Sequence, residues 1–221
     1  EKHNIKELFQ KDVRYIIPTF QRPYVWNQED QWEPLWNDVR NIAEEYVERL
    51  MEENSKQAAE EKTGTHFLGA IVLQQVPTAT AEIGRRNVID GQQRMTTLQI
   101  LLDAAQEVME EEKYDKEAKQ LRRLVTNDED FAEGDDRFKL WPTLGDRNAF
   151  RAAMTNGQVT AGFSTSKIVQ AHEFFSFQIR EWLKSADLGG RADLANALHT
   201  ALLGLLVLVV IDLKSGDDAY R

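Results

Sequence analysis

The sequence contains no cysteine among its 221 residues. Disulfide bonds, zinc sites built from thiolates and a thiol nucleophile are therefore excluded. This composition is typical of a reducing compartment, and because no signal peptide opens the sequence we expect a cytoplasmic protein. The longest apolar run, 201–211, falls well short of the roughly 20 residues that span a bilayer, so we expect no membrane partner.

Positive charge is also scarce, with 27 basic against 37 acidic residues and a formal net charge of -10. A surface of this sign repels DNA at long range, so any site that binds phosphate must be local. Histidine is rare, and none of the four lies in an H-x-H or H-N-N arrangement. We therefore expect structural histidines and no metal-dependent nuclease site in this chain. The four are His3, His66, His172 and His199.

The hydrophobic pattern predicts an α+β fold, with a small mixed sheet in the first half, helices packed on it and a mostly helical second half. Strands are expected at 13–17, 67–75, 87–89 and 205–213, and helices from 28, from 91, near 146–154, at 168–182 and near 194–202. We expect 52–65 to be a solvated tail and loop, and 110–119 to continue or kink the preceding helix. A domain boundary at 113–136 is conceivable, although the final strand could return to the first sheet.

The stretch "VIDGQQR", 88–94, joins a predicted strand to a predicted helix. If Asp90 is the N-cap, Gln93 stands three residues further on, and the two form a capping box. That interpretation needs no ligand, but it leaves Arg94 unexplained.

The alternative interpretation is a phosphate site. The first N–H groups of a helix are unpaired and carry the positive end of its dipole, and Gly91 lets an anion approach the backbone closely. Arg94 can grip phosphate oxygens, and Thr96 and Thr97 add hydroxyl groups. A phosphate there would redirect the carboxylate of Asp90, for which Mg²⁺ is a suitable partner. The sequence contains neither a P-loop nor a Rossmann fingerprint.

A second polar segment, "IPTFQRPYVW", 17–26, is kept rigid by Pro18 and Pro23. Its aromatic residues Phe20, Tyr24 and Trp26 suit a cap on the core as well as a binding surface. Gln21 and Arg22 fit that structural role poorly, whereas an amide and a guanidinium on a stiff loop suit a phosphate or a base edge.

Together with "HFLGAIVLQ", "VIDGQQRMTTLQIL" and "DRFKLWPTLGDRNAF", in that order, this segment resembles the N-terminal domain of GmrSD-type, modification-dependent restriction proteins. Within that family the sequence is most similar to the SspE branch, which senses phosphorothioate DNA. The resemblance implies a ParB/sulfiredoxin-like nucleotide- and DNA-sensing core at 1–112, with 113–221 packed on it in one continuous unit. It also implies hydrolysis of GTP or ATP with Mg²⁺, recognition of modified DNA, and a separate C-terminal HNH-type nuclease domain beyond Arg221.

The resemblance also implies roles for individual residues. Those with a catalytic role are Asp90, Gln92, Gln93 and Arg94, with Asp90 as a metal ligand, and those that bind nucleotide are Gly91, Gln93, Arg94, Thr96 and Thr97. Those that sense the DNA modification are Pro18, Phe20, Gln21, Arg22, Pro23 and Tyr24. Those with a supporting role are Lys139, Trp141, Pro142, Thr143 and Arg147. Two alternatives stay open: a modified-DNA-binding module without nucleotide turnover, and a scaffold in which these signatures only hold the fold.

Overall fold

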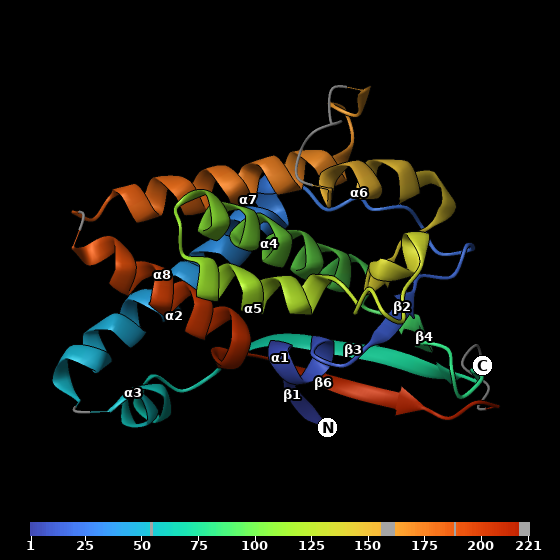
Figure 1. Cartoon of the computed structure of the whole chain (residues 1–221), viewed down its shortest axis with the longest axis horizontal. Coiled ribbons are helices and arrows are strands. Elements are labelled where there is room, and N and C mark those ends of the chain that lie inside the picture. The colour runs from blue at the N-terminus through green and yellow to red at the C-terminus, as the bar shows by residue number, and fades with distance from the viewer. Residues whose placement is uncertain (54, 156–161, 188, 217–221) are drawn as a thin grey trace.

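The computed structural model describes residues 1–53, 55–155, 162–187 and 189–216. It has the predicted α+β class, with its long helices stacked over a six-stranded sheet (Figure 1). The strand order is β1-β6-β3-β4-β2-β5. The strands are β1 (Lys2–Asn4), β2 (Val13–Ile16), β3 (His66–Val76), β4 (Gly84–Asp90), β5 (Leu140–Trp141) and β6 (Leu206–Leu213).

The sheet is mixed. β3 pairs with β4 antiparallel and with β6 parallel, whereas β2 pairs parallel with both β4 and β5, and β1 closes the other edge antiparallel to β6. The predicted return of the last strand to the sheet is therefore confirmed, because β6 lies directly beside β3. The ParB/sulfiredoxin-like character that the resemblance implies stays a prediction.

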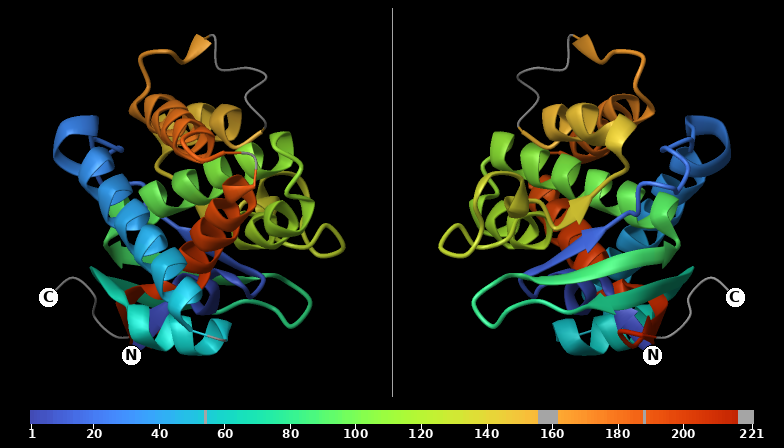
Figure 2. Two further views of the ribbon diagram at one scale, coloured as in Figure 1. Left: turned by 90° about the vertical axis from the view of Figure 1, so that its left-hand side faces the viewer. Right: turned by 90° about the vertical axis from the view of Figure 1, so that its right-hand side faces the viewer.

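The central helix is α4, which lies between the sheet and α7 (Figures 1 and 2). Most of its residues are buried, which is typical of a helix surrounded by other elements. The α-helices are α1 (Ile5–Phe9), α2 (Glu33–Glu52), α3 (Lys56–Thr63), α4 (Gln92–Glu111), α5 (Asp115–Val125), α6 (Arg147–Ala153), α7 (Lys167–Lys184) and α8 (Gly190–Thr200). Short helical turns are η1 (Gln28–Trp32), η2 (Gly134–Arg137), η3 (Leu144–Asp146) and η5 (Ala201–Leu205). In the described part of the chain, no helix has both the length and the apolar character needed to cross a membrane.

Two local predictions were wrong. The segment predicted as a solvated tail contains α3, because the Ser55 side chain accepts a hydrogen bond from Ala58 N and caps its start. The helix starting near residue 91 does not run through 110–119, since Lys113 has a φ of 67° and separates α4 from α5.

The pair β1 and α1 at the start of the chain was not predicted. Asn4 and Glu7 form a reciprocal capping box that starts α1, although the helix is only five residues long. Its buried residues Ile5 and Phe9 pack into the core, so burial rather than helix propensity stabilises this short element.

Candidate functional site

The candidate site is built at the turn from β4 into α4. Gly91 is the only residue between them, and its φ of 89° lies in the left-handed region that glycine tolerates. A Cβ at this position would lie 2.6 Å from Cγ2 of Ile71 on β3. Both the backbone angle and the close approach therefore require glycine at the turn.

The predicted capping box is not formed, because Asp90 is the last residue of β4 and Gly91 occupies the N-cap position. The Asp90 carboxylate accepts a hydrogen bond from Gly91 N at 2.8 Å, one residue too early to cap the helix. Among the described residues, no side chain caps α4. The first main-chain N–H groups of this 20-residue helix, from Gln92 to Arg94, therefore point out of its end without a capping partner.

Gln93 binds the segment 17–26 to the N-terminal end of α4 through side-chain hydrogen bonds. Its carboxamide oxygen accepts hydrogen bonds from Val25 N at 2.9 Å and Trp26 N at 3.3 Å, while its amide nitrogen donates to Pro23 O at 3.0 Å. The side chain is only 6% exposed. Both ends of the carboxamide are thus occupied by the main chain of the loop, so Gln93 fixes the loop on α4.

A second link joins two glutamines. Gln92 Nε2 donates to Gln21 Oε1 at 3.0 Å, and Gln21 Nε2 donates to Ile89 O at 3.0 Å, at the end of β4. The carboxamide oxygen of Gln92 accepts no hydrogen bond from any described residue, and it is available to a ligand or a water molecule.

The side chain of Arg94 extends from the first turn of α4 toward β3. Its Nη1 donates to Ala70 O at 2.9 Å, and the guanidinium lies over Gly69, whose φ is 113°. A Cβ on Gly69 would lie 2.8 Å from Cζ of Arg94, and β3 carries a register shift between Phe67 and Ala70. Glycine at an irregular point of the strand therefore makes the room that the guanidinium occupies.

Arg94 also borders a cavity of about 180 Å³, lined by Trp26, Leu68 and Leu98 among others. This volume is below the roughly 300–1,000 Å³ of sites that enclose a small molecule. Of the residues from Asp90 to Arg94, Arg94 alone lines it, so the cavity does not enclose the end of α4. A larger cavity of about 640 Å³ lies elsewhere, along α4 and α5, and it is not lined by any residue from Asp90 to Thr97.

Tyr24 anchors the loop from inside. Its hydroxyl lies 2.7 Å from Thr97 Oγ1 and accepts a hydrogen bond from Trp32 Nε1 at 2.9 Å. Burial raises the pKa of Tyr24 well above its ordinary value, although the hydrogen bonds to Thr97 and Trp32 lower it in part. Thr96 and Thr97 donate back to Gln92 O and Gln93 O, so neither hydroxyl points at the helix end.

The loop exposes a different set of side chains. Phe20 is 67% exposed, Val25 is 46% exposed, and Arg22 and Pro23 are exposed beside them, while Pro18 is half-buried. Arg22 forms no hydrogen bond or ion pair with a described residue, so its charge is available to a partner. The residues predicted to sense modified DNA thus divide into two anchors, Gln21 and Tyr24, three exposed residues, and the half-buried Pro18.

The third signature supports the same loop. Asp146 Oδ2 accepts hydrogen bonds from Tyr24 N at 2.7 Å and Thr143 Oγ1 at 3.1 Å. Arg147 Nε donates to Pro142 O at 3.3 Å, and its Cζ lies 5.4 Å from the ring of Trp141. The three signatures therefore meet around Tyr24, as a single connected cluster.

Lys139 lies apart from the turn, and its side chain is fully buried. Its ammonium donates to Lys11 O at 2.8 Å and Asn127 Oδ1 at 2.9 Å, and Asp12 Oδ1 is 3.7 Å away. Burial lowers the pKa of Lys139 to about 8, although Asp12 opposes the shift. These contacts join β5 to the segment before β2, which is a structural role.

The sequence of residues 5–221 matches the model of a family described as the N-terminal domain of GmrSD restriction endonuclease. This chain belongs to that family. No curated protein sequence matches it. The GmrSD N-terminal domain identifies the chain as part of a restriction-defence protein.

Sequence reasoning missed several residues that shape the site in this GmrSD-type domain. Trp32, Gly69 and Asp146 position Tyr24, Arg94 and the loop, respectively. Of these three residues, only Gly69 could have been predicted from the sequence, since a glycine inside a strand pattern marks a bulge or a close approach of another group. The other two partners lie 8 and 122 residues from Tyr24, and nothing in their spacing predicts those contacts.

Proposed function

We propose that this GmrSD N-terminal domain binds GTP or ATP as the Mg²⁺ complex at the start of α4, hydrolyses it, and couples hydrolysis to recognition of modified DNA. Phosphorothioate DNA is the modification that we propose it senses. The protein would act in the cytoplasm, and the hydrolysis would control a C-terminal HNH-type nuclease domain.

The observation that carries the proposal is the uncapped N-terminus of α4 behind Gly91. Unpaired N–H groups and the helix dipole attract a phosphate, and the glycine leaves no side chain in the way. Arg94, in the first turn of the same helix, supplies the positive charge that we assign to the site, and its guanidinium extends toward β3, where Nη1 donates to Ala70 O. The contact of Arg94 with Ala70 O uses one of its five N–H groups, so the others can bind phosphate oxygens.

The side chains then take different roles in phosphoryl transfer, which depends on charge stabilisation and an aligned water. Arg94 stabilises phosphate charge. The free oxygen of Gln92 orients the water, whereas Gln93 acts as a positioning residue because the loop occupies its carboxamide. The exposed carboxylate of Asp90 fits a Mg²⁺ ligand, since it makes a single hydrogen bond with the described residues and the ion prefers oxygen donors. When bound, Mg²⁺ neutralises phosphate charge.

The hydrogen bonds between Gln93 and the loop couple nucleotide binding to the recognition of modified DNA. Val25 N, Trp26 N and Pro23 O bind Gln93 within the first turn of α4, so a phosphate that shifts this turn also shifts the loop. On that loop the exposed Arg22 lies in sequence between the exposed apolar residues Phe20 and Val25. A phosphorothioate replaces one oxygen by a larger and softer sulfur, and an apolar surface beside a cation suits that group.

The test is calorimetric titration of the domain with GTP and ATP in the presence of Mg²⁺, followed by measurement of phosphate release with and without phosphorothioate duplex. We expect Arg94→Ala to weaken nucleotide binding by about 10–100-fold, because it removes a charge-assisted hydrogen-bonding group. Arg123→Ala is the control, since Arg123 is an exposed arginine on α5. Equal affinity and turnover in the folded Arg94→Ala protein would contradict the site.

A second function is favoured by one observation: Gln93, Thr96 and Thr97 all have internal partners, and none of these side chains offers its groups to a nucleotide. In that case the N-terminal end of α4 would bind a phosphate of the DNA backbone itself, and no nucleotide would be hydrolysed. Preference for phosphorothioate over plain duplex, reduced by Arg22→Ala and unaffected by nucleotide, would favour this binding module.

A further inference from the structure

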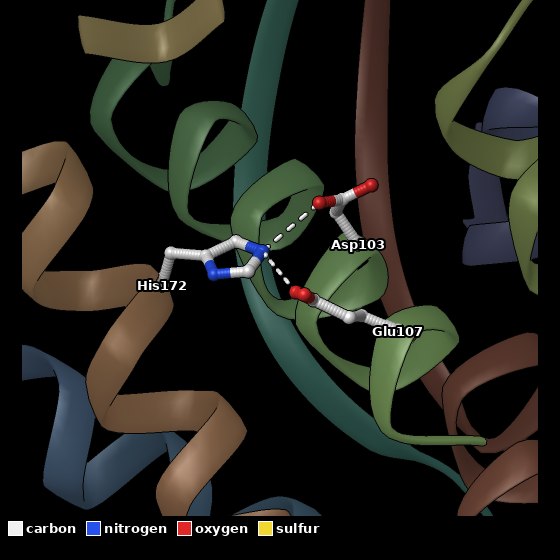
Figure 3. Close-up of side chains that lie close together, drawn as sticks. All are labelled: Asp103, Glu107 and His172. Atoms are coloured by element: carbon white, nitrogen blue, oxygen red, sulfur yellow. Dashed lines mark hydrogen bonds and ion pairs between the residues drawn. The ribbon is translucent and has the colours of Figure 1, made fainter. Parts of the chain in front are cut away.

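Away from the α4 terminus, three ionisable side chains meet in the interior between α4 and α7. Asp103 and Glu107 stand one turn apart on α4, and both reach toward His172 on α7 (Figure 3). Nε2 of His172 lies 2.9 Å from Asp103 Oδ2 and 3.6 Å from Glu107 Oε2. The side chains of Asp103, Glu107 and His172 are 7%, 23% and 8% exposed.

A single proton does not balance the charges of this cluster, and burial raises the pKa of both Asp103 and Glu107, so the cluster needs either a second proton or a cation. Even an imidazolium at His172 leaves one negative charge in a largely buried position, which is unfavourable without compensation. The neighbouring arginines have their own partners, since Arg122 pairs with Glu110 and Arg180 pairs with Glu111. A divalent cation with neutral histidine would bring two carboxylates and one imidazole to zero net charge.

The geometry also fits a metal ion. One ligand atom from each of the three side chains can be chosen so that all lie within 4.8 Å of one another. Atoms that bind a metal at about 2.0–2.2 Å in a tetrahedral arrangement are roughly 3.4 Å apart, so small side-chain shifts would suffice. The other ring nitrogen of His172, Nδ1, lies 3.5 Å from Ser176 Oγ. A polar partner on the second nitrogen is the usual accompaniment of a metal-binding histidine, because it fixes the tautomer.

We propose that Asp103, Glu107 and His172 bind a divalent transition-metal ion, Zn²⁺ or Mn²⁺, that joins α4 to α7. Asp103 also lines the cavity of about 640 Å³, together with Gln106 and Arg122. Because Asp103 lines this cavity, a water molecule in it is the additional ligand that we expect at the ion. The ion would hold the centre of α4, the same helix whose first turn carries Gln92 to Arg94.

The experiment uses the whole chain after treatment with a chelator and then titration with ZnCl₂, MnCl₂ or MgCl₂. We expect one Zn²⁺ or Mn²⁺ per chain by calorimetry, little response to Mg²⁺, and a rise in Tm of about 5–10 °C at a hundredfold excess over Kd. Co²⁺ provides a spectroscopic probe, because its visible absorption depends on the number and arrangement of its ligands. Glu107→Gln and His172→Gln should each lower the affinity at least tenfold and change that spectrum.

His66→Gln is the matched control, since His66 Nε2 lies 3.2 Å from a carboxylate oxygen of Asp38 but has no second acidic partner in the described part of the chain. It should bind metal like the parent protein. Circular dichroism verifies that each variant is folded, and Glu107→Gln, the substitution at the most exposed of the three residues, keeps the test valid if another variant unfolds. A folded parent protein that binds none of the ions, or folded Glu107→Gln and His172→Gln variants that bind as the parent does, would overturn the proposal.

Discussion

The hydroxyl groups of Tyr24 and Thr97 lie 2.7 Å apart, one on the loop that carries Gln21 and Arg22 and the other in the second turn of α4. Trp32 donates to the same tyrosine oxygen. Because all three side chains belong to separate elements, a single buried oxygen connects η1, the loop and the helix.

Tyr24→Phe should therefore lower the free energy of unfolding by about 1–3 kcal/mol, because it leaves the buried Trp32 Nε1 and Thr97 Oγ1 without this partner. Urea unfolding measures the loss. Thr97→Val combined with Tyr24→Phe should cost less than the sum of the two single changes, since both remove the same contact. Tyr114→Phe is the control, and a loss of equal size there would contradict the role of the hydroxyl.

Gln93→Ala should release the loop from α4. The change leaves Val25 N, Trp26 N and Pro23 O without their partner, and we expect a loss of about 2–4 kcal/mol in stability. Hydrogen exchange at the amides of Val25 and Trp26 should accelerate more than in the rest of the chain. Gln57→Ala, at an exposed glutamine of α3, serves as the comparison, and unchanged protection of both amides would show that the loop is held by other contacts.

Gly91→Ala and Gly134→Ala separate the cost of backbone strain from the cost of a steric clash. Both glycines have positive φ, at 89° and 57°, so alanine is strained at either position by about 1 kcal/mol. A Cβ at Gly134 meets nothing within 4 Å, whereas at Gly91 it would lie 2.6 Å from Ile71 Cγ2. We expect Gly91→Ala to be the more destabilising by about 1–3 kcal/mol in thermal or urea unfolding. Equal losses of stability in the two variants would mean that β3 shifts without a free-energy cost to accommodate the added Cβ.

Lys139 should make the stability depend on pH. Its pKa is about 8 in the folded chain and 10.5 in a solvated lysine, so between these values the unfolded chain binds a proton that the folded chain does not. The free energy of unfolding should therefore rise with pH across this window, by at most about 1.4 kcal/mol per pH unit. Below pH 8 both states are protonated, and the cost of burying the charge is present in full.

The measurement for Lys139 is the difference in unfolding free energy between the parent protein and Lys139→Met at pH 7 to 10, in which other titrating groups cancel. This difference should increase with pH in favour of the parent. Lys119→Met, at an exposed lysine of α5, should show no such trend. A difference that stays flat for Lys139→Met would contradict the lowered pKa.

Local patterns were enough to predict the elements around the site, whereas its contacts were not predictable. The strand, the glycine turn and the helix of β4 and α4 follow from periodicity and one residue type, since each depends on neighbours within a few positions. The capping box failed because Gly91 in a left-handed conformation moved the helix start one residue beyond Asp90. The contacts of Gln93 with Val25, and of Asp103 with His172, join residues 68 and 69 positions apart.

The position of β6 in the sheet has a consequence for synthesis of the protein. The first strand, β1, has β6 as its neighbour in the sheet, and β6 ends at Leu213. During synthesis on the ribosome, Lys2–Asn4 therefore has no strand to pair with until more than two hundred further residues have been translated. The sheet is therefore completed late, when β6 pairs with β3 on one side and with β1 on the other.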